Sequence, residues 1–152
     1  MMFEDLRDLY QEVILDRGRK PRHGRRLEVF DADAKGDNPM CGDRVQVFVR
    51  HDGEAVAELG FEARGCAISI ASADLMADAV IGLGDAEIAD MARKFTDMAR
   101  SGETADVALQ ALRPLAGVHE YPSRIKCATL PWAALQAALS GPSEQKGVAS
   151  GE

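Results

Sequence analysis

The sequence predicts one α+β domain, in which a small antiparallel sheet of three strands with a central hairpin packs against roughly four to six helices. Residues 43–63 show a period of two around an Asp-Gly turn, and helical patterns flank them on both sides. Of the 152 residues, 46% are apolar and 28% are charged, which is typical of a single soluble domain with its own core. We expect this domain to cover residues 1–139. The tail, residues 140–152, has few apolar residues and is expected to be disordered.

The N-terminal segment predicts an amphipathic helix from Met2 to about Arg17. Its apolar residues recur at helical spacing: Phe3, Leu6, Tyr10, Val13 and Ile14. Residues 17–26, RGRKPRHGRR, follow with six Lys or Arg and no acid, and their glycines and proline should end the helix. Such a charge run is commonly a solvated loop, and contact with an acidic partner surface is the alternative. Residues 27–37 are expected to form a short edge strand or an extended loop.

The central hairpin is predicted by two alternating stretches that flank Asp52-Gly53, a strong turn signal. The apolar positions on one face are Val45, Val47, Val49, Ala57, Leu59, Phe61 and Ala63. An antiparallel hairpin returns the chain to the place where it began. Cys41, just before the first strand, and Cys66, just after the second, are therefore expected at the same end of the sheet.

Two helices are predicted next. Residues 67–81 are rich in alanine with few polar groups, which indicates a buried helix that ends at Gly82. Asp85 is a suitable N-cap for the following helix, in which apolar residues form a stripe between Ile88 and Met98.

The last part of the chain predicts two further helices. A short one is expected from residue 104 or 105 to about Leu112, ending before Pro114. The final helix is expected from about Ser123 to Leu139, and Pro131 inside it should kink or split it.

Charge and cysteine content exclude several classes of protein. The formal net charge is −7, with 25 acids against 18 Lys and Arg, which disfavours general affinity for nucleic acid. No apolar run is long enough for a membrane span, and the first residues are acidic where a secretion signal would be basic. We therefore expect a cytoplasmic protein. Three cysteines are too few for a disulfide framework, so they are expected to be thiols, metal ligands or catalytic groups.

Each cysteine lies at a predicted element boundary. Cys41 is in a turn, Cys66 opens a helix, and Cys127 lies about one turn into the last helix. Asp43 is two residues after Cys41, so in extended backbone both side chains lie on the same side. Three thiolates and one carboxylate suit zinc or an iron–sulfur cluster. Buried cysteines acting as small apolar residues are the alternative, and spacing alone leaves both interpretations open.

Three motifs resemble those of the NifU/IscU-like superfamily, which serves iron–sulfur cluster assembly. They are NPMCGD at 38–43, GCAISIAS at 65–72 and RIKCA at 124–128. The resemblance runs in the same order from about residue 9 to residue 139. It implies an IscU/NifU-N-like fold.

Two features resemble the SufU branch of that superfamily. The IscU branch has a histidine immediately before the third cysteine, whereas this chain has Lys126. The SufU branch also carries an extra helical stretch before that cysteine, and residues 94–120 resemble it.

The resemblance implies a zinc-bound sulfurtransferase. Cys41, Asp43, Cys66 and Cys127 would hold zinc, and a histidine of a SufS-type cysteine desulfurase would replace Cys41 on the metal. Cys41 would then accept persulfide sulfur and pass it to downstream SUF scaffold proteins. Arg124 lies three residues before Cys127, on roughly the same face of a helix. Arg124 or Lys126 would offset part of the site's negative charge, and Cys41 and Arg124 are the catalytic candidates.

Two alternatives use the same residues. One is an IscU-like scaffold that assembles a [2Fe-2S] cluster on the Cys/Asp ligands. The other is an adaptor with a purely structural zinc site.

Overall fold

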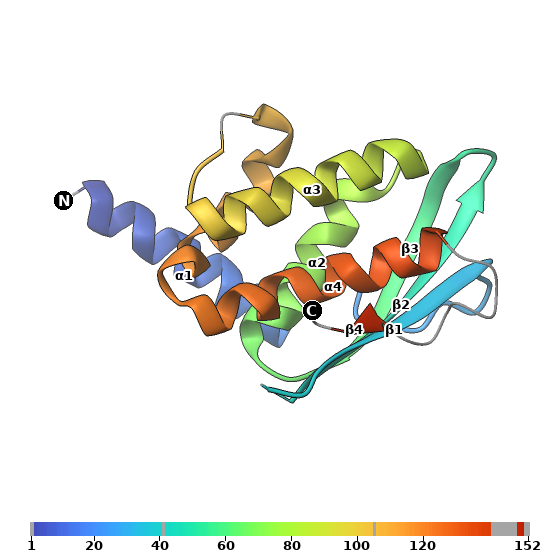
Figure 1. Cartoon of the computed structure of the whole chain (residues 1–152), viewed down its shortest axis with the longest axis horizontal. Helices are drawn as coiled ribbons and strands as arrows, with labels where there is room; N and C mark the ends of the chain where they lie inside the picture. The colour runs from blue at the N-terminus through green and yellow to red at the C-terminus, as the bar shows by residue number, and fades with distance from the viewer. Residues whose placement is uncertain (1, 41, 105, 141–148, 151–152) are drawn as a thin grey trace.

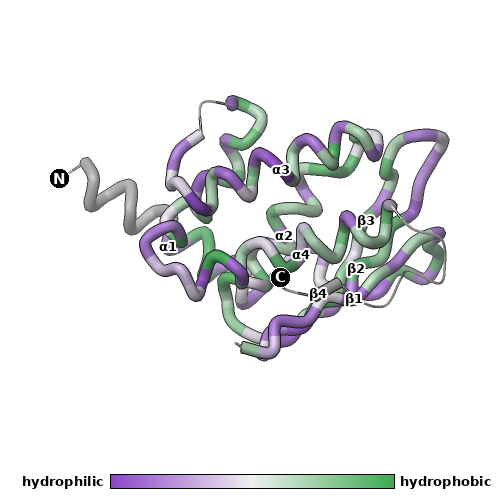
Figure 2. The backbone as a smooth tube through the Cα atoms, viewed as in Figure 1, coloured by the Kyte–Doolittle hydropathy of each residue, from purple (hydrophilic) through white to green (hydrophobic). Residues whose placement is uncertain are grey.

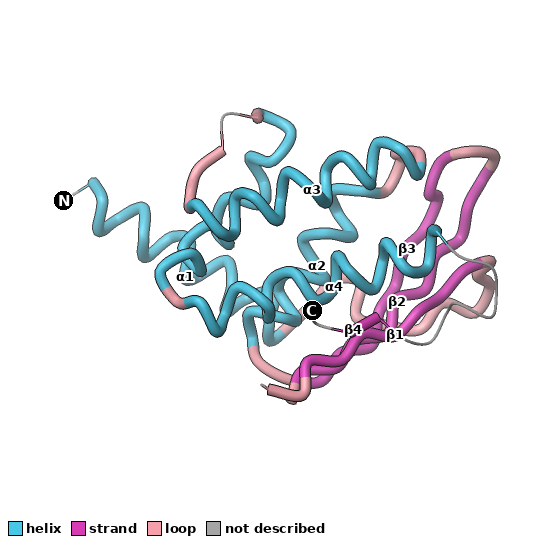
Figure 3. The backbone as a smooth tube through the Cα atoms, in the orientation of Figure 1, coloured by secondary structure: helices cyan, strands magenta, loops and turns pink. Residues whose placement is uncertain are grey.

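The computed structural model describes the backbone of residues 2–40, 42–104, 106–140 and 149–150, and side chains between residues 11 and 140 within these ranges. The elements in chain order are α1 (Met2–Arg19), β1 (Ala32–Asn38), β2 (Asp43–Asp52), β3 (Ala55–Arg64), α2 (Ala67–Val80), α3 (Asp85–Ser101), the 3-10 helix η1 (Val107–Glu120), α4 (Pro122–Ser140) and β4 (Ala149–Ser150). Figure 1 shows their arrangement. The strands gather on one side of the molecule and the helices on the other (Figure 3).

The sheet has the strand order β3-β2-β1-β4. The pairs β1–β2 and β2–β3 are antiparallel, and the two residues of β4 run parallel to β1. The predicted α+β fold with a central hairpin is therefore confirmed, and the segment expected as an edge strand or loop supplies β1. Residues 141–148 and 151–152 of the tail lie outside the described residues.

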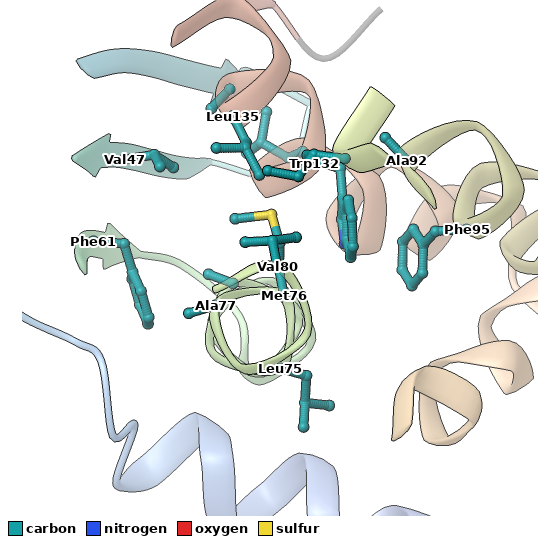
Figure 4. Packing of buried hydrophobic residues seen from close by; sticks show 14 of the residues in the cluster. Val47, Phe61, Leu75, Met76, Ala77, Val80, Ala92, Phe95, Trp132 and Leu135 are labelled. Atoms are coloured by element: carbon teal, nitrogen blue, oxygen red, sulfur yellow. The ribbon is translucent and has the colours of Figure 1, made fainter. Parts of the chain in front are cut away.

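The core lies between the inner face of the sheet and the helices. In Figure 4, Val47 of β2 and Phe61 of β3 lie on one side, with Met76 of α2 and Leu135 of α4 between the layers. Nine of the fourteen residues of α2 are buried, in agreement with the mostly hydrophobic colouring of this helix in Figure 2. Within the described residues, no helix is both long and apolar enough to cross a membrane.

The segment after α3 differs from the prediction. Instead of a short helix that stops before Pro114, a 3-10 helix runs through the proline from Val107 to Glu120. Its buried residues are Leu109, Leu112, Leu115 and Val118. They recur every three residues, which places them on one face of a helix with three residues per turn. Packing of this apolar row accounts for the longer element.

Two helix starts and one proline also differ from expectation. α3 begins at Asp85 itself, because Gly84 occupies the cap position and donates its N–H to the Glu87 carboxylate at 3.0 Å. α4 begins at Pro122, a favourable first position for proline. Of the predicted kink or split at Pro131, the split was wrong, since α4 is one continuous helix with that proline buried inside it.

Candidate metal site

Three of the four predicted ligands come together at one end of the sheet. Asp43 begins β2, Cys66 caps α2, and Cys127 lies in the second turn of α4. One ligand atom from each lies within 4.8 Å of the others. Asp43 and Cys127 are fully buried, while Cys66 is half-buried. Cys41, the fourth predicted ligand, lies outside the described residues.

The return of the β2–β3 hairpin places Cys66 beside Asp43. The Cys66 N–H donates to Asp43 Oδ1 at 2.9 Å, and Cys66 Sγ lies 3.8 Å from Asp43 Oδ2. Gly65, between β3 and α2, has a φ of +143°. A Cβ at this position would overlap the Asp43 carboxylate. A glycine is therefore needed at position 65 for the two donors to approach one another.

The turn from β1 to β2 is shaped by hydrogen bonds to Asn38. Its backbone carbonyl accepts from the Gly42 N–H at 2.8 Å, and its side-chain Oδ1 accepts from the Met40 N–H at 3.2 Å. Gly42 has a φ of +76°, a conformation that glycine adopts without strain. Asn38 is 2% exposed, whereas Met40 is 87% exposed. The turn thus combines a buried anchor with a tip in solvent.

Cys127 is positioned by contacts of α4. Arg124 Nη1 lies 3.9 Å from Cys127 Sγ, which agrees with the predicted shared face. The Ser72 hydroxyl of α2 donates to the Ala128 carbonyl at 2.5 Å, which fixes α2 against α4 next to the cysteine. Lys126, by contrast, lines a groove between α3 and α4. Of the two cations proposed to offset the site's charge, Arg124 is therefore the one that meets a sulfur atom.

The comparisons with known proteins agree with this geometry. The family described as "NifU-like N terminal domain" matches residues 9–141. The chain belongs to this NifU-like family. The superfamily resemblance carried by the three cysteine motifs is thereby confirmed.

Two relatives and one solved structure illustrate the range of names within this NifU-like family. The zinc-dependent sulfurtransferase SufU of Bacillus subtilis is 39% identical over 136 residues, covering 87% of this chain and 90% of that protein. The iron–sulfur cluster assembly scaffold protein IscU of Streptococcus pyogenes serotype M1 is 37% identical over 140 residues, covering 91% and 87%. A crystal structure from Fervidobacterium islandicum AW-1, described as an iron–sulfur cluster assembly scaffold protein for the SUF system, has a TM-score of 0.75 at 32% identity, covering 85% and 95%.

The described donors of this NifU-like chain fit a tetrahedral zinc ion. With Zn–S bonds of about 2.3 Å and Zn–O bonds of about 2.1 Å, neighbouring ligand atoms lie about 3.6–3.8 Å apart. The 3.8 Å between Cys66 Sγ and Asp43 Oδ2 is close to the expected S···O separation, and all the ligand atoms lie within 4.8 Å of one another. Two thiolates and a carboxylate suit zinc, and a [2Fe-2S] cluster also takes thiolates. The donor set thus accommodates either group.

Reasoning from sequence missed the role of Asn38. The motif NPMCGD was singled out for its cysteine and aspartate, but its asparagine carries the turn. A signal for this was present, because an Asn side chain commonly accepts a hydrogen bond from the backbone N–H two residues further on. Among the described residues, the group of potential metal ligands contains two cysteines and an aspartate and no histidine.

Proposed function

We propose that this chain is a zinc-dependent sulfurtransferase of iron–sulfur cluster biogenesis, which accepts persulfide sulfur on Cys41 from a SufS-type cysteine desulfurase. The observation that carries the proposal is the gathering of Asp43, Cys66 and Cys127 within 4.8 Å on three regular elements. The B. subtilis relative, named a zinc-dependent sulfurtransferase, supports it. Lys126, where a scaffold of the IscU branch has histidine, supports it as well.

The proposal assigns different roles to the ligands according to the backbone that carries them. Asp43 begins a strand, Cys66 caps a helix, and Cys127 lies within a helix. Regular secondary structure therefore fixes the positions of these three ligands. Cys41 belongs to a turn whose neighbouring residue Met40 is exposed to solvent. Bound zinc would keep thiolates deprotonated near neutral pH and, having no redox chemistry, would leave sulfur exchange to the protein. The proposal therefore assigns to Cys41 the role of the ligand that meets a partner.

The transfer step is an ordinary thiol exchange. The Cys41 thiolate attacks the outer sulfur of the desulfurase persulfide, and a new S–S bond forms on Cys41. The S–S bond of the desulfurase breaks, and its cysteine leaves as a thiolate with the electron pair. Repetition of the exchange would pass the sulfur to a SUF scaffold protein. The guanidinium of Arg124, next to Cys127, offsets part of the negative charge of the thiolates in the site.

A scaffold for a [2Fe-2S] cluster is the second candidate function. It is favoured by the S. pyogenes relative, named an iron–sulfur cluster assembly scaffold protein, which is similar to nearly the same share of the chain. The same four residues would then hold the cluster. Both candidates belong to iron–sulfur cluster assembly, and they differ in what Cys41 carries.

The deciding experiment measures metal and sulfane sulfur on the purified protein, with and without a SufS-type desulfurase and cysteine. We expect about one zinc per chain, and persulfide on Cys41 only when the desulfurase is present. Cys41→Ser should lose the persulfide, and Met40→Ser, in the same turn, should keep it. Iron with acid-labile sulfide in place of zinc would overturn the proposal in favour of the scaffold. Bound zinc without any acceptance of sulfur would overturn the proposal in favour of an adaptor with a purely structural zinc site.

A further inference from the structure

The basic stretch of residues 17–26 is held against α2 by Arg17, near the end of α1, and by His23, in the middle of the stretch. Arg17 Nη1 lies 2.7 Å from Asp74 Oδ2 and 2.8 Å from Asp78 Oδ2, and both carboxylates belong to α2. The His23 N–H donates to Asp74 Oδ1 at 2.8 Å, and His23 Nε2 lies 2.7 Å from Asp78 Oδ1. Asp74 is fully buried. These contacts hold the intervening turn rigidly against α2, which lowers the entropy cost of using it as a binding surface.

The anchored stretch leaves five cations in solvent. Residues 19–26 are here called the basic turn. The exposed basic residues of this segment are Arg19, Lys20, Arg22, Arg25 and Arg26. None of them forms an ion pair with a carboxylate of the described residues, although Arg26 stacks its guanidinium 5.0 Å from the centre of the Phe48 ring. The side chains of Arg17 and His23, the two residues of the 17–26 stretch that have carboxylate partners, point toward α2. The remaining positive charge is therefore available to another molecule.

The basic turn lies beside the metal site. Gly18 packs so closely on the start of α2 that an added Cβ would come within 2.9 Å of the Ala67 Cβ. Ala67 directly follows Cys66. Further along, the Phe61 N–H of β3 donates to the His23 carbonyl at 3.1 Å, so the turn continues over the strand that leads to Cys66. The basic turn therefore starts at the rim of the site, next to the helix that Cys66 caps, and extends from there along α2 and β3.

The positive charge of residues 17–26 contrasts with the negative charge of the rest of the chain. The chain carries a net charge of −7, and the six cations of residues 17–26 leave the remainder at −13. An acidic partner is repelled over most of this surface and attracted only at the basic turn, so the turn would fix its orientation. A nucleic acid, whose phosphates extend well beyond one turn, would meet the repulsive remainder.

We propose that the basic turn is the docking surface for an acidic protein surface that surrounds the sulfur donor of the desulfurase. This inference rests on the proposed function and adds the position and charge of the contact. Attraction at the rim accelerates encounter and turns the donor toward Cys41. The contact is electrostatic, so it weakens as salt is added.

The test reverses charge within the turn and leaves its anchors intact. Lys20→Glu and Arg22→Glu are compared with wild type and with Arg100→Glu, an exposed cation at the end of α3 that undergoes the same change in charge. The association rate with the desulfurase is measured at about 0.05 M and about 0.3 M salt. Zinc content and thermal unfolding are measured in parallel to verify that each variant is folded and loaded.

We expect both turn variants to associate about tenfold more slowly at low salt, with the difference shrinking at high salt and Arg100→Glu behaving like wild type. Folded turn variants that associate as fast as wild type would overturn the docking surface while leaving the proposed function standing. A wild-type protein that neither binds the desulfurase nor accepts its sulfur would overturn the proposed function itself. Tighter binding of a labelled nucleic-acid duplex than of the desulfurase would also overturn the proposal.

Discussion

Replacement of Gly65 by alanine is expected to damage both the fold and the metal site. The new Cβ would overlap the Asp43 carboxylate, and φ is +143° at this position. Backbone strain at positive φ costs about 1–3 kcal/mol. Displacement of Asp43 would also break its hydrogen bond from the Cys66 N–H, which contributes about 1.5–3 kcal/mol because the acceptor is charged. The free energy of unfolding of the zinc-free protein should therefore fall by about 2.5–6 kcal/mol, the sum of the two contributions.

Gly82→Ala separates the two causes. Gly82 also has a positive φ, +97°, but an added Cβ there would have nothing within 4 Å. It should therefore cost only the strain, about 1–3 kcal/mol, and leave zinc affinity unchanged. Urea unfolding in the presence of a chelator measures the stability of each variant, and competition with a chromophoric chelator measures zinc affinity. If Gly65→Ala matches Gly82→Ala in both measurements, the reasoning about the Asp43–Cys66 approach is refuted.

Three further predictions follow from other contacts. Arg124→Gln should weaken zinc binding by about threefold to tenfold, since it removes a partly solvated cation next to a thiolate, and Lys126→Gln should not change it in the same chelator competition. The hydrogen bond to Asp31, followed by that to Asp85, raises the pKa of His51. His51→Gln should therefore destabilise most below about pH 6, and the difference from wild type should shrink as pH rises through the raised pKa; a pH-independent difference in urea unfolding would contradict this. Leu112→Ala should lower the free energy of unfolding by about 2–5 kcal/mol, because Leu112 is fully buried in η1, and a loss below 1 kcal/mol would mean that η1 is not part of the core.

The part of the site formed by the hairpin could be predicted from sequence. Alternation and the Asp-Gly turn are local signals, and they suffice to bring Asp43 and Cys66 to the same end of the sheet. The position of Cys127 is different, because it depends on how α4 packs against β1 and β2. Periodicity within α4 does not encode that packing. Reasoning from the residues named Cys127 as a candidate donor but left a buried, non-ligating cysteine as the alternative, and the resemblance of the RIKCA motif to a known family favoured the ligand role.

The errors along the chain have physical causes as well. Pro114 was expected to stop a helix and Pro131 to kink or split one, because each proline removes a backbone donor. In the structure, burial of Leu112 and Leu115 on either side of Pro114, and of Pro131 itself, outweighs the missing hydrogen bond. Tertiary packing of this kind is invisible to a rule applied one residue at a time. Such a rule also cannot find the carboxylate partners of Arg17, because they lie on α2, far from Arg17 in the sequence.

The wide separation of the described ligands has a consequence for synthesis of the protein. Asp43 and Cys66 are close in the chain, but Cys127 is contributed by the last helix. A growing chain that has not yet released α4 from the ribosome offers two of these donors and lacks the third. If the site holds a metal as proposed, stable capture of that metal would require α4 to have emerged and packed. A metal-loaded site would thus mean that translation has passed residue 127 and that α4 has packed against the rest of the domain.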